Sequence, residues 1–136
     1  MLKLGIIRET KNPPDRRVPL TPAQCRSLLD SCPGLDITVQ PSPIRCFGDD
    51  EYAAEGIRLD VDLTDRDVLM GVKEVKLEAL IPDKTYFFFS HTAKEQPYNR
   101  GLLQEIIRKR IRLVDYEYLT LDGVRVVAFG RWAGLV

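Results

Sequence analysis

The chain has 136 residues, which is enough for one domain with a buried core. Its 20 basic and 20 acidic side chains cancel, so neither a nucleic acid nor an anionic membrane would meet a net attractive field. No apolar run approaches the roughly 20 residues of a membrane span, and the first residues lack the pattern of a signal peptide. We therefore expect a cytoplasmic protein with no nucleic-acid partner and no membrane partner.

The cysteines, Cys25, Cys32 and Cys46, are odd in number and lack metal-ligand spacing with the single histidine, His91. This pattern favours reduced structural thiols and no bound metal.

The first half of the chain alternates predicted strands and helices. Residues 2–7 form a short apolar run ended by charge, which is typical of a buried strand. Thr21 is a candidate N-cap, with Pro22 at the first helical position and Gln24 completing a capping box. This helix should end at Pro33-Gly34, and the residues expected to face the core are Leu28, Leu29 and Cys32.

A second strand is predicted over 35–39. Asp49 or Asp50 is expected to cap a short helix that runs to residue 54 and ends at Gly56.

The second half continues the alternation. Strands are predicted over 68–72, 86–89 and 111–114. Asn99 is expected to cap a helix with one apolar stripe, formed by Leu102, Leu103, Ile106 and Ile107. Residues 116–120 and 124–129 are predicted to form a hairpin around Asp122-Gly123.

Strands that alternate with helices predict an α/β domain with a largely parallel sheet. In such sheets, ligands bind beyond the carboxyl ends of the strands. Any one polar residue there can equally be a solvated strand end, yet such residues recur after the predicted strands: Arg8, Glu9, Lys73, Glu74, Ser90, His91, Asp115, Glu117 and Arg131.

Two of these strand-end residues can exchange protons. Lys73 follows an apolar strand, and a partly desolvated lysine can act as a base near neutral pH. His91 follows an aromatic strand, and imidazole is the side chain best matched to proton transfer at neutral pH. The alternatives are an ordinary strand-end lysine beside Glu74 and a packed polar histidine.

Arginines flank the same regions. Guanidinium groups bind carboxylates through paired hydrogen bonds, and a substrate with several carboxylates needs several such groups. The candidates are Arg16, Arg17, Arg125 and Arg131, of which at least one is expected to be surface charge.

The last eight residues are apolar and aromatic, with no polar tail, which we interpret as a truncation. Neither a G-x-G-x-x-G turn nor a Walker motif is present, so no phosphate-binding loop is expected.

Several motifs together resemble a known family. Residues 8–11 and 17–22 resemble the opening of the alanine dehydrogenase and proton-translocating transhydrogenase superfamily. Residues 71–74, 88–94, 113–117 and 123–134 are similar to saccharopine dehydrogenase of the lysine-forming type, and equally to the lysine-ketoglutarate reductase half of the bifunctional lysine-degrading enzyme. The segment 123–134 is the most specific of these.

The resemblance implies a fold and a domain organisation. The fold would be a Rossmann-like (flavodoxin-like), mostly parallel sheet with flanking helices and a C-terminal β-hairpin. Residues 1–136 would form a substrate-binding lobe, truncated before the Rossmann domain that binds NAD or NADP.

The resemblance also implies roles for single residues. Lys73 and His91 would be the catalytic acid-base pair, and Arg17 and Arg125 would bind substrate carboxylates. Glu74 and Glu117 would tune the protonation of the pair, and Arg131 is a possible further substrate contact. The implied reaction interconverts saccharopine with lysine and 2-oxoglutarate. The alternatives are an alanine dehydrogenase and a stand-alone amino-acid-binding module.

Overall fold

The structure, a computed structural model, describes residues 1–92 and 97–127. Its centre is a six-stranded sheet in which each neighbouring pair runs parallel, in the order β3-β2-β1-β4-β5-β6. The strands are β1 (Leu2–Ile6), β2 (Leu35–Val39), β3 (Arg58–Leu59), β4 (Val68–Lys73), β5 (Thr85–Phe89) and β6 (Arg112–Asp115). The prediction of an α/β domain with a largely parallel sheet is confirmed. The short strand β3 was not predicted.

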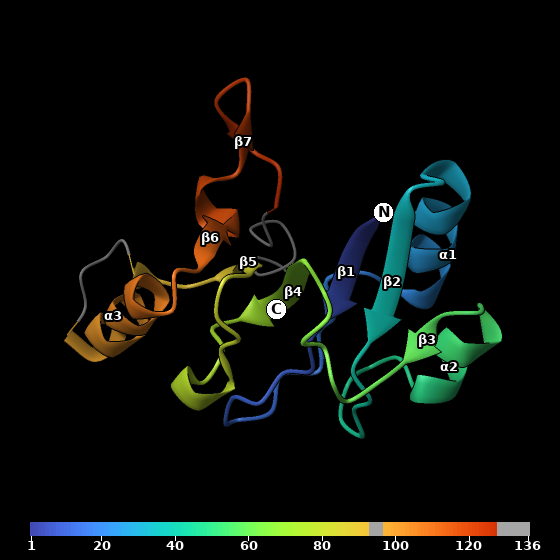
Figure 1. The fold of residues 1–136 in the computed structure, drawn as a ribbon, viewed down its shortest axis with the longest axis horizontal. Coiled ribbons are helices and arrows are strands. Elements are labelled where there is room, and N and C mark those ends of the chain that lie inside the picture. Colours follow the sequence, from blue (N-terminus) through green and yellow to red (C-terminus); the bar gives the residue numbers. More distant parts are fainter. Residues whose placement is uncertain (93–96, 128–136) are drawn as a thin grey trace, which may run out of the picture.

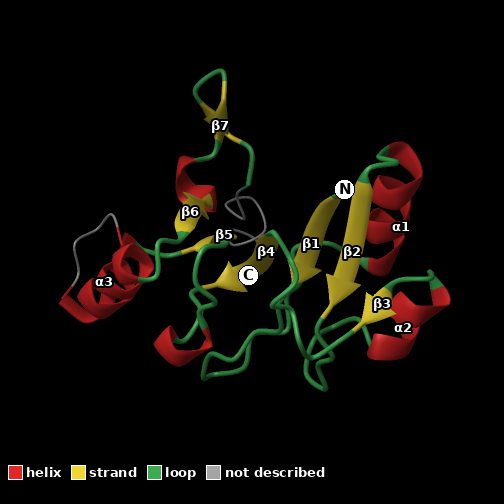
Figure 2. Ribbon diagram, in the orientation of Figure 1, coloured by secondary structure: helices red, strands yellow, loops and turns green. Residues whose placement is uncertain are grey.

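Helices flank the sheet at both ends (Figures 1 and 2). Helices α1 (Pro22–Ser31) and α2 (Asp49–Ala54) lie beside β2 and β3, whereas α3 (Arg100–Arg108) lies at the end formed by β5 and β6. Two apolar cores result, because successive residues of a strand point to opposite faces. In β1, Leu4 and Ile6 pack into the core of α1 and α2, whereas Ile7, just after the strand, packs against the core of α3.

The start of α1 follows the sequence prediction. Thr21 is the N-cap, its hydroxyl accepts from the backbone N–H of Gln24 at 3.2 Å, and the Gln24 side chain accepts from the Thr21 N–H at 2.9 Å. The expected cap of α2 is wrong, because Gly48 is the N-cap residue and Asp49 is already helical. The Asp49 carboxylate is engaged elsewhere, by the Arg45 side chain and the Ser42 N–H.

Two expectations about buried side chains need correction. Cys32 is exposed because it lies beyond the last turn of α1, and Cys25 is the buried thiol of that helix. The four apolar residues of α3 do not form one buried stripe. Leu102 and Ile106 are buried, whereas Leu103 and Ile107 are exposed, because only one side of α3 packs on the core.

A hairpin follows the sheet. After β6 the chain makes a 3₁₀ turn at Tyr116–Tyr118, and β7 (Thr120–Leu121) pairs antiparallel with β8 (Val124–Arg125). Asp122 and Gly123 both have positive φ, at 51° and 77°, as a two-residue hairpin turn requires. The hairpin projects from the sheet (Figure 1). It is shorter than predicted within the described range, and the rest of the expected second strand, from residue 128, lies outside that range.

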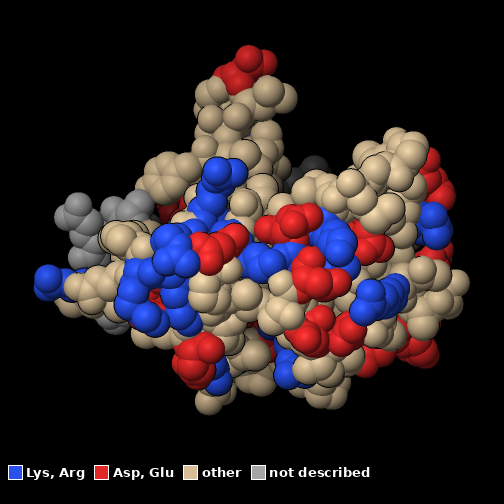
Figure 3. All heavy atoms as spheres, viewed as in Figure 1, with Lys and Arg blue, Asp and Glu red and all other residues tan. Residues whose placement is uncertain are grey.

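Charges of both signs are interleaved on the face shown in Figure 3. In the described part of the chain, no helix has the length and apolar character needed to cross a bilayer.

Candidate functional site

The strand order reverses between β1 and β4. From β1 the chain builds outward through β2 and β3, and it then crosses back to add β4, β5 and β6 on the other side. The loops after two such strands diverge, and the crevice between them is where open α/β sheets bind ligands. The segments that leave β1 and β4 at this crevice begin at Ile7 and Glu74.

A cavity of about 330 Å³ lies at this edge of the sheet. We call it the charged cavity. It is lined by Arg17, Val72, Lys73, Phe89, His91, Glu117 and Arg125. Five of these are residues that the sequence put forward, and they come from the loop after β1, the ends of β4 and β5, the turn after β6, and β8. Segments up to 108 positions apart in sequence, Arg17 and Arg125, therefore share one cavity.

Lys73 is the last residue of β4, and its backbone is held by Glu9 from the loop after β1. One carboxylate oxygen of Glu9 accepts from the Lys73 N–H at 2.7 Å, and the other accepts from the Val72 N–H at 3.1 Å. Burial raises the pKa of Glu9, and the two amide donors oppose that rise by stabilising the carboxylate. Glu9 therefore joins the exits of the two central strands.

Arg17 is oriented by Asp15. Its guanidinium donates to both carboxylate oxygens, with Nε to Oδ1 at 3.0 Å and an Nη to Oδ2 at 2.6 Å. The Arg17 backbone N–H also donates to Oδ1 at 3.0 Å. These bonds lower the pKa of Asp15, chiefly through the side-chain bond to Arg17. Arg17 thus enters the cavity as a cation whose direction is fixed by a local carboxylate.

The loop that carries Arg17 is fastened to the loop after β2. The Cys46 N–H donates to the Arg16 carbonyl at 2.8 Å, and Arg16 Nε donates to the Ile44 carbonyl at 3.2 Å. Arg16 therefore has a structural role in joining the two loops. The hydroxyl of Tyr52 in α2 adds a bond to the Leu20 carbonyl at 2.7 Å.

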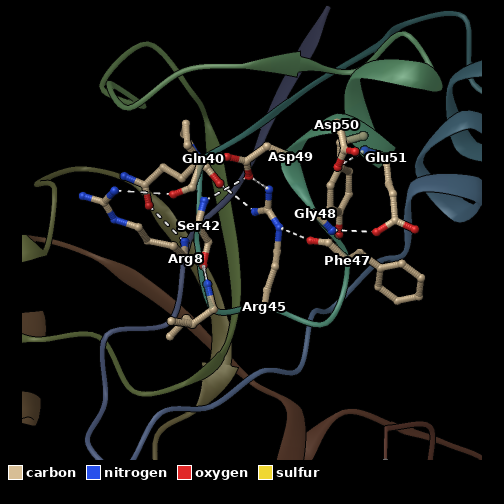
Figure 4. Close-up of polar contacts among 12 residues, drawn as sticks. Arg8, Gln40, Ser42, Arg45, Phe47, Gly48, Asp49, Asp50 and Glu51 are labelled. Carbon is tan, nitrogen blue, oxygen red and sulfur yellow. Dashed lines mark hydrogen bonds and ion pairs between the residues drawn. The ribbon is translucent and has the colours of Figure 1, made fainter.

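Arg45 organises the loop after β2 (Figure 4). Its buried guanidinium donates to the carbonyls of Gln40 at 2.6 Å and Phe47 at 2.8 Å, pairs with Asp49, and lies 4.5 Å from the centroid of the Tyr52 ring. The side chain of Gln40 in turn accepts from the Arg8 N–H at 3.0 Å. The loop is thereby tied to the exit of β1, which helps to fix the segment that leads to Arg17.

His91 is placed by its backbone. It adopts a left-handed conformation with φ of 58°, which is uncommon for a residue other than glycine. Its carbonyl accepts from the Asn99 amide at 2.8 Å. Before it, buried Ser90 donates its N–H to Asp115 at 3.2 Å and its hydroxyl to the same oxygen. Asn99 lies at the expected cap position of α3, but its side chain binds this loop rather than the helix.

Asp115 also determines where Glu117 lies. Its second oxygen accepts from the Glu117 N–H at 2.9 Å, which starts the 3₁₀ turn after β6. Glu117 faces Arg125 of the hairpin at 3.6 Å. Tyr116 lies between Asp115 and Glu117 in the sequence. Its ring packs on Phe89 with centroids 5.1 Å apart, and burial raises the pKa of the Tyr116 hydroxyl. One aspartate therefore links the ends of β5 and β6 beneath the cavity.

Among the predicted site residues that the structure describes, Glu74 does not line the charged cavity. Glu74 pairs with Lys11 at 2.6 Å, and its other carboxylate oxygen is buried with no hydrogen-bond partner in the described part of the chain. Arg131 lies outside the described residues.

A second cavity, of about 420 Å³, adjoins the charged cavity and shares Val72 and Phe89 with it. Apart from the Tyr116 hydroxyl, the side chains of the described residues that line it are apolar: Val18, Pro19, Leu20, Met70, Val72, Phe89, Tyr116, Val126 and Val127. The site thus combines a charged part with an apolar part.

The loop after β1 differs from the dinucleotide-binding loop of a Rossmann domain. The strand order is that of Rossmann domains, but the loop after β1 has no glycine turn, and Glu9 of this loop accepts from the Val72 and Lys73 amides at the end of β4. In the ranges 1–92 and 97–127, no group of His, Cys, Asp and Glu side chains could hold a metal ion.

The fold is that of an α/β domain with a six-stranded parallel sheet, and its charged cavity lies at the crevice where the strand order reverses. Residues 5–136 match the family described as alanine dehydrogenase/PNT, N-terminal domain, so the chain belongs to this family. This confirms the resemblance seen in the sequence.

The names of individual relatives are more specific than the family description. The mitochondrial α-aminoadipic semialdehyde synthase of Bos taurus is 43% identical over 133 residues, which cover 97% of this chain and 14% of that protein. The α-aminoadipic semialdehyde synthase of Arabidopsis thaliana is 42% identical over 138 residues, which cover 96% of this chain and 13% of the relative. The saccharopine dehydrogenase [NAD(+), L-lysine-forming] of Emericella nidulans is 35% identical over 139 residues, which cover 97% of this chain and 36% of that protein. The chain thus spans only a minor part of these relatives.

Solved structures agree on the fold. An L-alanine dehydrogenase superposes with a TM-score of 0.71 at 23% identity, covering 87% of this chain and 34% of that chain. A transhydrogenase from Sinorhizobium meliloti superposes with a TM-score of 0.69 at 15% identity, covering 85% of this chain and 35% of that chain.

Sequence reasoning missed three residues that build the site. Asp15 lies in a polar, proline-rich loop that gives no local signal for its pairing with Arg17. Glu9 and Asp115 were noted only as strand-end residues, because their partners are 63 and 25 positions away.

Proposed function

We propose that this chain is the amino-terminal, substrate-binding lobe of an NAD(P)-dependent dehydrogenase that interconverts saccharopine with lysine and 2-oxoglutarate. In this proposal residues 1–136 precede a separate Rossmann domain, which holds NAD or NADP. No metal takes part. The family membership and the relatives named α-aminoadipic semialdehyde synthase and saccharopine dehydrogenase support this assignment.

The observation that carries the proposal is the grouping of Arg17, Lys73, His91, Glu117 and Arg125 around one cavity. Saccharopine carries several carboxylates and one secondary amine. Guanidinium groups can hold such carboxylates, while a lysine and a histidine can move the protons of the amine and of water. The adjoining apolar cavity has a lining suited to an aliphatic chain.

In the proposed reaction the carbon next to the amine nitrogen would lose a hydride, and NAD or NADP held by the Rossmann domain would supply the acceptor. Lys73 takes or holds the proton of the amine, and His91 activates the water that attacks the resulting imine and shuttles protons as the adduct breaks down. Arg17 and Arg125 hold substrate carboxylates. Glu74 and Glu117 set the local potential around the pair, and Arg131 remains a possible additional carboxylate contact.

Alanine dehydrogenase is the second candidate, because the structural likeness to an L-alanine dehydrogenase extends over 87% of the chain. A smaller substrate with a single carboxylate would need fewer cations than the cavity presents. The lining therefore favours saccharopine.

Steady-state kinetics of the complete natural protein test the assignment. Saccharopine with NAD or NADP, and lysine with 2-oxoglutarate and the reduced cofactors, should be turned over much faster than alanine. Efficient alanine oxidation without saccharopine turnover would instead support the second candidate. Binding of an amino acid with no turnover of any substrate would support a non-catalytic binding module.

A further inference from the structure

The end of β4 is irregular at the residue that the proposed mechanism needs. Met70 is the partner of Phe87 on β5, but the next pairing joins Lys73 to Phe89. Three steps along β4 thus match two steps along β5, so β4 contains one extra residue. Such a bulge re-aims the side chains that follow it.

The extra residue decides which face Lys73 occupies. Paired residues of neighbouring strands point to the same face of a sheet, and a one-residue slip turns a side chain to the other face. With an unbroken register Lys73 would lie opposite Ser90, on the face of Phe88 and the α3 core. With the bulge it shares the face of Phe89, which lines the charged cavity.

Glu9 binds the backbone within this bulge. In a regular strand, successive N–H groups point to opposite edges, so one carboxylate cannot accept from two neighbours. Glu9 accepts from both Val72 and Lys73, at 3.1 and 2.7 Å. Its carboxylate therefore fits the bulged conformation and not the regular one.

Gly71 makes room for this contact. A Cβ at this position would lie 2.8 Å from side-chain carbons of Ile7 and 3.1 Å from a carboxylate oxygen of Glu9. A larger residue here would therefore have to displace the Ile7 side chain and crowd the Glu9 carboxylate.

We propose that Glu9, with Gly71, is a positioning residue that holds the β4 bulge and thereby directs Lys73 into the charged cavity. This inference rests on the proposed function, in which Lys73 handles the amine proton. Glu9 acts through the backbone of Val72 and Lys73 and has no proton-transfer role of its own.

The test compares Glu9→Gln with a matched control, Glu51→Gln. Glu51 also accepts a backbone N–H, from Gly48 at 2.6 Å, but it does so at the start of α2. In the complete natural protein, Glu9→Gln should lower kcat for saccharopine by about 10²-fold, the typical cost of a small misplacement of a reacting group, with KM changed much less. Glu51→Gln should leave kcat unchanged.

Hydrogen exchange measured by mass spectrometry gives a second readout that does not need activity. The amides of Val72 and Lys73 should exchange faster in Glu9→Gln and at the wild-type rate in Glu51→Gln. Gly71→Ala keeps every carboxylate and should reproduce both effects of Glu9→Gln, which separates loss of the bulge from loss of a charge.

Faster exchange with an unchanged kcat, or a lowered kcat with unchanged exchange, would overturn the positioning role. If the wild-type protein turns over none of the proposed substrates, the proposed function fails on its own account. The exchange measurement then still decides the structural part of the inference, and unchanged exchange would overturn it.

Discussion

At the scale of single residues, the cations of the charged cavity have carboxylates beside them. Arg17 is paired with Asp15, Arg125 faces Glu117, and the charge of Lys73 contributes to the lowered pKa of Asp15. These carboxylates reduce the repulsion between cations that share one cavity. The arrangement allows several positive groups to meet the carboxylates of a substrate without a prohibitive cost to folding.

Lys73 and His91 should act as a coupled pair. Loss of one proton-transfer group typically costs about 10²- to 10⁴-fold in rate, and groups that act together are not additive. We expect Lys73→Met and His91→Gln each to lower kcat for saccharopine severely, and the double variant to cost much less than the product. Lys76→Met, at an exposed site nearby, is the control for steady-state kinetics. Near-normal turnover in both single variants would show that Lys73 and His91 are polar residues at strand ends with no role in proton transfer.

Arg17 should act mainly on substrate affinity. A guanidinium that holds a carboxylate does so in the ground state and the transition state alike, so its removal weakens both. Arg17→Ala should therefore raise KM for saccharopine more than it lowers kcat. The control is Arg58→Ala, because Arg58 is an exposed residue of β3 whose guanidinium pairs with the nearby Asp60. A lowered kcat with an unchanged KM would assign Arg17 to the chemical step instead.

Asp15 should contribute to stability in mild but not in strong acid. Its pKa is below the ordinary value of 3.8 because Arg17 stabilises the carboxylate. A lowered pKa in the folded state gives stability that is complete above pH 3.8 and is lost as the pH falls through the folded-state value. The Tm of the wild type should exceed that of Asp15→Asn at pH 6, and the difference should shrink as the pH falls below 3.8. A constant difference would contradict this linkage.

At the scale of elements, local chemistry determines where helices begin, whereas packing determines which side is buried. Both partners of the capping box of α1 lie within four residues of sequence. By contrast, α3 has four apolar residues in its sequence, and contact with the core selects Leu102 and Ile106 as the buried pair.

The cap of α1 should make a measurable contribution to stability. Replacing an N-cap threonine by alanine typically costs about 1 kcal/mol, because a helical N–H loses its acceptor. Thr21→Ala should therefore lower the Tm, and Gln24→Ala, which removes the other half of the box, should lower it less. Thermal unfolding followed by circular dichroism measures both. An unchanged Tm in Thr21→Ala would show that water replaces the cap at no cost.

At the scale of the whole molecule, the sheet has the strand order of a dinucleotide-binding domain but a different chemistry at its crevice. The loop after β1 lacks the glycine turn that receives a pyrophosphate in such domains, and Glu9 of this loop instead accepts from the Val72 and Lys73 amides at the end of β4. The compartment in which the protein works stays a prediction, since some relatives carry the word mitochondrial in their names.

Residues 1–136 alone should not bind NAD tightly. Calorimetric titration of NAD or NADP into this chain should give no micromolar binding, because no glycine-rich turn receives the pyrophosphate. Micromolar binding would show that the lobe contributes a cofactor site of its own.

The sequence by itself determined the class of fold, the main strands and helices, and the identity of the family. These features depend on local patterns: apolar runs of strand length, capping residues, turn residues and short motifs. Lys73 and His91 could be named in advance because they follow predicted parallel strands, whose carboxyl ends meet at one edge, whereas Arg17 and Arg125 were assigned to the substrate through the family resemblance.

Only the tertiary structure decided how these residues are held. The pairing of Glu9 with Val72 and Lys73 spans more than 60 positions, and that of Ser90 with Asp115 spans 25. The bulge that turns Lys73 toward the cavity depends on how β4 pairs with β5, and the sequence of either strand alone does not predict it. Contacts at such separations form only when the sheet assembles, so hydrophobic periodicity and local motifs cannot predict them.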